Sequence, residues 1–192
     1  MDEIKNHLMT YLNASREAVL WKAEGLSDHD LTRPLVPTGT NVLGLIQHLA
    51  SVEFGYFVQC LGQQVEHPRF AVLEASEDPE ADMWVPAGVP TSEILAFYRS
   101  AIEAANANIT ALPLEAAATV PWWAPEKRNP TVGRLLIHMN VETARHAGHL
   151  DIVRELIDGS AGDRQLSPNL PDYDANAWTD LYQKIQLAAD SR

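Results

Sequence analysis

Residues 131–159, TVGRLLIHMNVETARHAGHLDIVRELIDG, decide how the rest of the chain is interpreted. A threonine that can cap a helix opens this stretch and a glycine closes it, so we predict one long helix between Thr131 and Gly159. Four side chains that can bind a metal lie four, four and three residues apart, which puts them on one side of that helix. They are His138, Glu142, His146 and His149. Imidazoles gain little on a solvent-exposed face, so we favour a metal site over a polar surface stripe.

Composition narrows the class of protein. A chain of 192 residues can form one substantial core, and we expect a single domain over residues 1–192. Lys and Arg number 14 against 26 Asp and Glu, a net charge of -12, so we expect no nucleic-acid partner. Charged residues follow Met1 at once, and no apolar run approaches the length of a membrane span. We therefore expect a soluble cytoplasmic protein that does not bind membranes.

Cys60 is the only cysteine in the sequence. A single cysteine excludes an intrachain disulfide and a cysteine-based zinc site. Because Cys60 lies in an apolar helical pattern, we interpret it as buried packing, with a catalytic thiol as the less favoured alternative.

Apolar residues recur with a helical period in several further segments. We predict helices over residues 2–24, from Thr40 or Asn41 to about Leu61, from Thr91 or Ser92 to Leu112, and from about Ala175 to Ala189. Residues 62–90 lack a strong period, and we expect a long connection whose acidic part and His67 are solvated, pinned by a buried Trp84. No segment alternates as a strand does. The prediction is an all-α four-helix bundle with long crossovers and an extra C-terminal helix.

His48 lies on the apolar face of the second predicted helix. Such a histidine, taken alone, is more often a packed imidazole than a metal ligand. The stripe on the long helix changes this balance, because helical bundles assemble metal sites from facing His and Glu side chains. Spacing alone leaves two sets open, in which His48 joins either Glu142 and His146 or His138 and Glu142.

Residues that could contact a substrate lie near the ends of the predicted helices. Consecutive side chains point in different directions, so at least one of Trp122 and Trp123 should line a pocket or an interface. Together with Trp84, they are candidates for an apolar wall. Arg145, next to His146, either binds a carboxylate of a substrate or forms a surface ion pair.

Three segments resemble the DinB superfamily, and more narrowly its actinobacterial DUF664 branch. They are GLIQHLASVE (44–53), DPEADMW (78–84) and HMNVETARHAGHLDIVRELIDG (138–159). The resemblance implies a four-helix bundle in up-down-down-up order. It also implies a divalent metal held by one histidine of the second helix and two residues one turn apart on the fourth, which are His48, Glu142 and His146 here. Many members carry histidine at both positions of the fourth helix, so Glu142 is a departure.

That departure resembles the mycothiol-dependent branch, which includes maleylpyruvate isomerase and mycothiol S-transferases. The resemblance puts His149 beyond the ligands or in the pocket wall, and leaves His138 as a core residue or a neighbour of the site. It implies a metal-dependent S-transferase that activates mycothiol as a metal-bound thiolate for attack on a small electrophile. Zinc is the favoured metal, with nickel or iron as alternatives.

Two other functions are compatible with the same ligands. One is a hydrolase that uses metal-bound hydroxide, and the other is a non-catalytic, metal-binding stress-response bundle. The expected partners are a small electrophile and a low-molecular-weight thiol, and a homodimer is left open.

Overall fold

The computed structural model describes residues 3–165 and 168–192, and within these ranges the chain is all-helical with one isolated β-bridge. This confirms the predicted fold class. The helices, in chain order, are α1 (Glu3–Trp21), α2 (Asp28–Thr32), α3 (Val42–Phe57), η1 (Gln59–Leu61), α4 (Pro68–Glu74), α5 (Thr91–Ala111), η2 (Pro125–Lys127), α6 (Val132–Asp158) and α7 (Ala175–Asp190).

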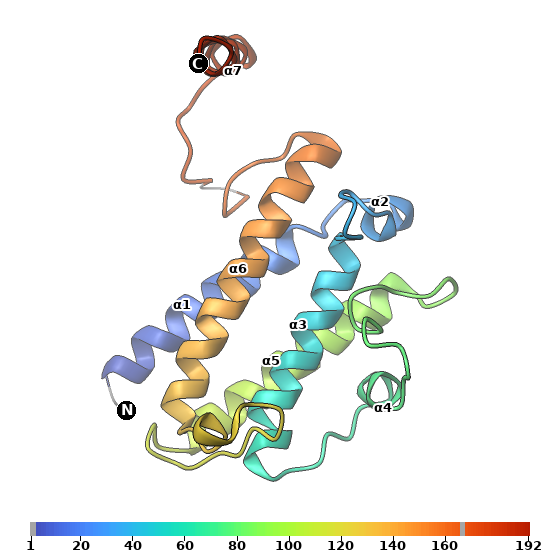
Figure 1. Ribbon diagram of the computed structural model, residues 1–192, viewed down its shortest axis with the longest axis vertical. Coiled ribbons are helices and arrows are strands. Elements are labelled where there is room, and N and C mark those ends of the chain that lie inside the picture. The colour runs from blue at the N-terminus through green and yellow to red at the C-terminus, as the bar shows by residue number, and fades with distance from the viewer. Residues whose placement is uncertain (1–2, 166–167) are drawn as a thin grey trace. The chain divides into compact units, whose positions relative to one another are not determined.

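The four long helices α1, α3, α5 and α6 form a bundle. Helix α1 packs along α6, α3 packs along α5, and α3 also contacts α6. Figure 1 shows that α1 and α6 run in one direction while α3 and α5 run in the other, which is the up-down-down-up order. Long crossovers join α1 to α3, α3 to α5 and α5 to α6, and the first two contain the short helices α2 and α4.

Helix α3 occupies the middle of the bundle. Asn41 begins it by accepting a hydrogen bond from the backbone N–H of Gly44 at 2.7 Å. Its apolar residues surround the helix because it contacts α2, α4, α5 and α6, and Leu45, Ile46 and Leu49 are at most 1% exposed. Burying each such side chain contributes about 1.5–3 kcal/mol. His48 lies among these residues, so packing fixes its position along the bundle.

Two helices end earlier than predicted. Helix α1 stops at Trp21 rather than residue 24, because the N–H groups of Ala23 and Glu24 bond to carbonyls three residues back and Gly25 adopts φ +75°. Its predicted start at Asp2 lies outside the described residues. Helix α3 stops at Phe57, and the chain then tightens into the 3-10 turn η1, so Cys60 is not on α3 itself.

Residues 62–90 contain a helix, α4, that the sequence pattern did not predict. Helix α4 begins with a proline at its first position, and the side chain of His67 accepts a hydrogen bond from the N–H of Arg69 at 3.2 Å. His67 also contacts the rings of Phe54 and Phe97, so it is a half-buried cap rather than the solvated residue we expected. In the sequence, Pro68 directly follows His67, a residue whose side chain can cap a helix. This pair was the signal that could have predicted the start of α4.

The chain divides into two compact units, of which one ends at Ala161 and the other begins at Gly162. Helix α7 belongs to the second unit, where Asp174 caps it and Tyr173 contacts the ring of Trp178. The extra C-terminal helix is thus confirmed, and a single domain over residues 1–192 stays a prediction. Among the described helices, none combines the length and the apolar character that crossing a membrane requires.

Candidate metal centre

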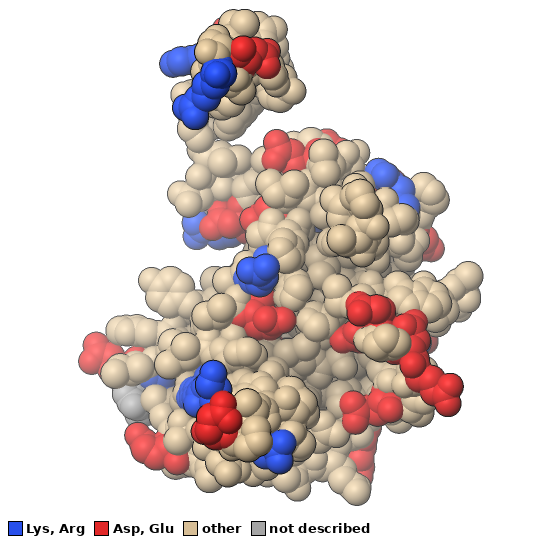
Figure 2. All heavy atoms as spheres, in the orientation of Figure 1, with Lys and Arg blue, Asp and Glu red and all other residues tan. Residues whose placement is uncertain are grey.

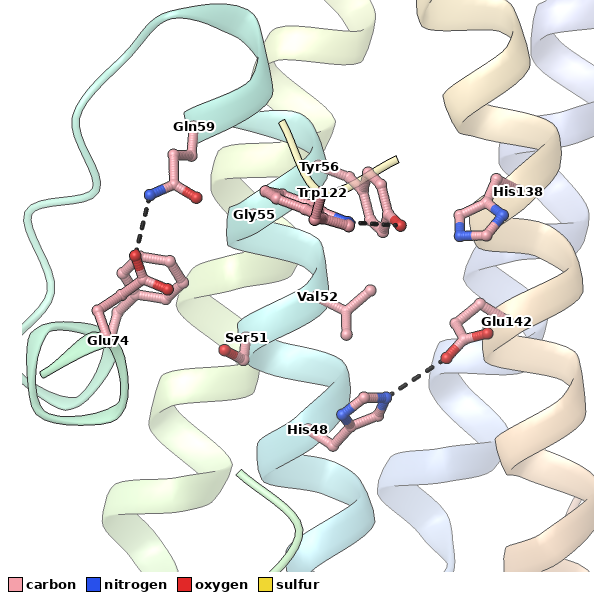
Figure 3. Close-up of a pocket in the computed structure, with 11 residues that line it drawn as sticks. His48, Ser51, Val52, Gly55, Tyr56, Gln59, Glu74, Trp122, His138 and Glu142 are labelled. Carbon is pink, nitrogen blue, oxygen red and sulfur yellow. Dashed lines mark hydrogen bonds and ion pairs between the residues drawn. The ribbon is translucent and has the colours of Figure 1, made fainter. Parts of the chain in front are cut away.

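Helices α3 and α6 bring His48, Glu142 and His146 together. Oε1 of Glu142 lies 3.4 Å from Nε2 of His48 and 3.1 Å from Nε2 of His146. The two imidazole ring centroids are 4.9 Å apart, and one potential ligand atom from each of the three side chains lies within 4.8 Å of the others. Figure 3 shows His48 and Glu142 pointing toward each other from the two helices.

The remaining ring nitrogens of the two histidines are also engaged. Nδ1 of His48 lies 2.7 Å from Oδ2 of Asp82, and Nδ1 of His146 lies 3.3 Å from Nδ1 of His149. A neutral imidazole that donates through Nδ1 presents the lone pair of Nε2. Both Nε2 atoms are therefore directed at the same small volume beside Glu142. Sequence reasoning missed Asp82, although the DPEADMW segment that contains it belongs to the resemblance.

A network of backbone contacts positions Asp82. The side-chain amide of Gln47 donates to the carbonyl oxygens of Ala81, Asp82 and Trp84 at 3.0, 3.1 and 2.9 Å. Nε of Arg69 donates to the amide oxygen of Gln47 at 2.8 Å, which links α4 to this network. Gln47, the residue before His48, thus holds the segment that carries Asp82 against α3.

The backbone at Met83 approaches the backbone of α3 so closely that only a glycine fits at position 44. A Cβ atom at Gly44 would lie 1.9 Å from the carbonyl oxygen of Met83, so no side chain fits there without displacing the segment. Asn41 also donates to that carbonyl, at 3.1 Å. The first turn of α3 therefore fixes the distance at which Asp82 meets His48.

Electrostatics in the cluster favour a cation. Burial lowers the pKa of His48, but hydrogen bonds to Asp82 and Glu142 outweigh it and raise the pKa to about 9. Hydrogen bonds from His146 and His48 lower the pKa of Glu142 despite its burial. The protein without metal thus holds a proton on His48 at neutral pH, in the place where a metal ion would neutralise the same carboxylates.

A groove with a volume of about 470 Å³ begins at His48 and Glu142. Figure 3 shows Gln59 and Glu74 at the end of the groove that lies away from His48 and Glu142. The other residues that line it are Ser51, Val52, Gly55, Tyr56, Phe70, Trp122 and His138. Trp122 and His138 also line a neighbouring hollow of about 570 Å³, which includes Trp123, Lys127 and Arg134.

The hydroxyl of Tyr56 anchors both adjacent tryptophans. It accepts hydrogen bonds from Nε1 of Trp122 at 3.3 Å and from Nε1 of Trp123 at 3.0 Å. Trp122 stays 54% exposed over the groove, while Trp123 contacts the ring of His138 at a centroid distance of 5.2 Å. Trp122 therefore lines the groove that begins at the cluster, and both tryptophans line the neighbouring hollow, as we predicted for at least one of them.

The other predicted site residues do not join the three converging side chains. His138 contacts the ring of Tyr56 at 4.9 Å, and burial lowers its pKa. Trp84 is 47% exposed and lines neither hollow; the carbonyl of Trp84, rather than a buried indole, ties its segment to α3. Arg145 is exposed and is absent from both linings. Its role in binding a carboxylate stays a prediction.

Cys60 belongs to η1, and its side chain packs in the core. It is 5% exposed, and burial raises the pKa of its thiol to about 11. A thiol that stays protonated and buried is a poor nucleophile. These properties agree with the packing role that the sequence indicated.

A comparison with protein families finds a match that covers most of the chain. The family model described as Mycothiol-S-transferase matches residues 7–159, which include α3, α5 and α6, all but the first four residues of α1, and the whole cluster. A comparison with curated proteins gives no significant match. The family match confirms the resemblance drawn from the three sequence segments.

Proposed function

The chain belongs to the mycothiol-S-transferase family, and from this premise we propose that it is a metal-dependent enzyme that joins the sulfur of mycothiol to a small electrophile. The observation that carries the proposal is the convergence of His48, Glu142 and His146 at one end of an open groove. We further propose a cytoplasmic location, where a low-molecular-weight thiol stays reduced.

The three side chains fit a divalent ion with an open position. Two imidazole nitrogens and one carboxylate suit zinc, nickel or iron, and we propose zinc. A divalent ion held there would lower the pKa of a bound thiol, so that the thiol is a thiolate near neutral pH. The contacts of Asp82 and His149 orient the two imidazoles for such an ion.

The chain itself contributes orientation and shielding to the reaction. The sulfur must come from outside, because Cys60 is buried with a raised pKa. Trp122 and Tyr56 line the groove that begins at the cluster and would shield one side of a thiol bound there. The electrophile would approach from the neighbouring hollow, where Arg134 and Lys127 could hold an anionic group.

Asp82 provides a direct test of the metal proposal. Replacing Asp82 with alanine should weaken metal binding by about tenfold to hundredfold, because the imidazole of His48 loses the acceptor that fixes its tautomer and orientation. The dissociation constant is measured by competition with a chromogenic chelator, and a thermal melt checks folding.

Glu80 is the matched control for Asp82. It lies two residues earlier on the same segment and its side chain is exposed, so Glu80→Ala should leave the dissociation constant unchanged. Equal dissociation constants for Asp82→Ala and Glu80→Ala would show that Asp82 does not position a metal ligand.

Dependence on mycothiol tests the transferase itself. The zinc-loaded protein is mixed with monochlorobimane, with and without mycothiol, and conjugate formation is followed by fluorescence and mass spectrometry. We expect enzyme-dependent formation of the mycothiol conjugate. Consumption of the electrophile that does not change when mycothiol is added would instead support the hydrolase. Bound metal without either reaction would support the non-catalytic bundle.

A further inference from the structure

We propose that the neighbouring hollow, which contains Lys127 and Arg134, binds small molecules that join a carboxylate to an aromatic body, and that the electrophile belongs to this class. The assignment of the electrophile rests on the proposed function, whereas binding of such a carboxylate does not. The hollow has a volume of about 570 Å³, a size typical of small-molecule sites. Trp122 and His138 line both the hollow and the groove, so a ligand in the hollow lies beside the candidate metal centre.

The two cations of the hollow have no acidic partner. Within the described residues, the ammonium of Lys127 and the guanidinium of Arg134 form no ion pair and no side-chain hydrogen bond, and no Asp or Glu lines the hollow. The guanidinium lies over the ring of Trp123, 5.1 Å from its centroid, and this contact holds it at the hollow. The chain has 26 Asp and Glu against 14 Lys and Arg, so the hollow is a positive region on an acidic protein.

These cations belong to a basic region around the start of α6. Figure 2 shows basic side chains gathered over the segment that leads into α6, with an acidic side chain among them. The sequence there supplies Lys127 and Arg128, then Arg134 in the first turn of α6, and also Glu126. Glu126 is exposed and does not line the hollow, so the hollow favours an anion.

An apolar strip of α6 extends from the cations toward the candidate metal centre. Four side chains of the lining follow one another at intervals of three, one and three residues, which puts them on one face of the helix: Arg134, Ile137, His138 and Val141. Ile137 and Val141 are 54% and 63% exposed, and Glu142 directly follows Val141. The helix rises by about 10 Å from Arg134 to Val141, which leaves room for an apolar body between a carboxylate and a reacting carbon.

The adjacent tryptophans favour an aromatic ring in the ligand. Hydrogen bonds to the hydroxyl of Tyr56 hold both indoles in place, and a flat ring can pack against them. A polar anion would leave Ile137 and Val141 in contact with water, and a neutral arene would leave the two cations unpaired. An apolar carboxylate matches both parts of the hollow.

The reaction on such an electrophile needs no further reactant. For an alkyl chloride, the sulfur of the thiolate forms a bond to the carbon that carries chlorine, the carbon–chlorine bond breaks, and chloride leaves with the bonding electrons. The proton of the thiol passes to solvent. The carboxylate takes no part in these bond changes, so the two cations contribute to binding and orientation.

Binding of an unreactive ligand tests the hollow without the chemistry. The probe is 4-phenylbutyrate, titrated calorimetrically into the zinc-loaded protein and compared with the uncharged 4-phenylbutyramide. We expect the carboxylate to bind about fivefold more tightly than the amide, because the two molecules share one shape and differ in charge. Equal binding of the two molecules, or no binding of 4-phenylbutyrate, would overturn the proposal.

Two variants locate the ligand in the hollow. Arg134→Met keeps an apolar stem beside Trp123 but loses the charge, so it should weaken binding of 4-phenylbutyrate by about threefold to fivefold. Ile137→Ala removes apolar surface and should weaken binding by about threefold. Arg99→Met on α5 and Ile152→Ala on α6 change exposed positions outside the hollow and should bind as the wild type does. Unchanged binding in Arg134→Met would place the carboxylate elsewhere, such as on the zinc ion, and would overturn the proposal.

A reactive pair of molecules separates this proposal from the proposed function. Mycothiol is offered 4-[4-(chloromethyl)phenyl]butyrate and its amide, and the ratio of the two kcat/KM values should fall by about threefold to fivefold in Arg134→Met but not in Arg99→Met. If the wild-type protein conjugates both molecules and Arg134→Met leaves the ratio unchanged, the hollow does not select the electrophile and the transferase stands. If the wild-type protein binds 4-phenylbutyrate in the hollow but shows no thiol-dependent reaction, the binding site stands and the transferase is wrong.

A second copy of the chain is the other occupant that could cover Ile137 and Val141. Sedimentation velocity at several protein concentrations detects this, with the wild-type protein compared with Ile137→Ala and with the wild-type protein saturated with 4-phenylbutyrate. We expect the same oligomeric state in all three samples. A dimer that dissociates in Ile137→Ala or on addition of the probe would show that this face is an interface between copies, and would overturn the proposal.

Discussion

Replacing His48 with alanine should weaken metal binding by more than about a hundredfold, because ligand loss exceeds the effect of losing an outer hydrogen bond. The same result is expected for Glu142→Ala and His146→Ala, since each removes one of three converging side chains. Mycothiol-dependent activity should disappear with the metal. Metal content is measured by atomic emission after dialysis, and the dissociation constant by chelator competition.

His138→Ala is the control on the same helix. His138 lies one turn before Glu142, but its ring contacts Tyr56 and Trp123 rather than the cluster, so this variant should keep its metal. Full metal content in all three ligand variants would disprove the assigned site. Metal loss in His138→Ala with retention in His146→Ala would move the site one turn toward the start of α6.

The sequence was sufficient to predict the long helices and a short set of candidate metal ligands. Periodicity placed the imidazole stripe on one helix and His48 on another, but it could not choose between His138 and His146 as the partner of Glu142. The resemblance favoured His146. The structure supplies a physical reason, because α3 and α6 run in opposite directions and the level of His138 along α6 matches that of Tyr56 rather than that of His48.

Asp82 and the groove could not be found from periodicity. Both depend on how residues 62–90 fold back onto α3, and the contacts that decide this are single and non-periodic. Gln47 binds three carbonyls of the segment, and Gly44 allows the backbone of Met83 to approach. The sequence of an apolar helix does not reveal which segment its glutamine and glycine contact. The structure shows these contacts directly.

Glu53→Gln should reduce the free energy of unfolding by about 3–5 kcal/mol, because it leaves the buried guanidinium of Arg16 without its counter-charge. Arg16 is 2% exposed and Glu53 is fully buried. Two hydrogen bonds join them, at 2.7 and 2.6 Å, and Arg16 also donates to the side chains of Asn13 and Asn106, both at 2.8 Å. Urea unfolding of the metal-free protein measures the change, with the exposed Glu103→Gln expected within about 0.5 kcal/mol of wild type.

The double variant Arg16→Met with Glu53→Leu distinguishes a charge effect from a packing effect. Removing both charges eliminates the unpaired cation, so the double variant should be more stable than Glu53→Gln although it has lost more polar contacts. A double variant as unstable as the single one would mean that shape, not charge, explains the loss. Metal must be absent in these measurements, because an ion that binds only the folded chain adds its own stabilisation and would hide the defect. With metal added back, the same variants should regain stability. The ion pair joins α1 to α3 and the proposed ligands lie on α3 and α6, so both belong to the same cooperative bundle.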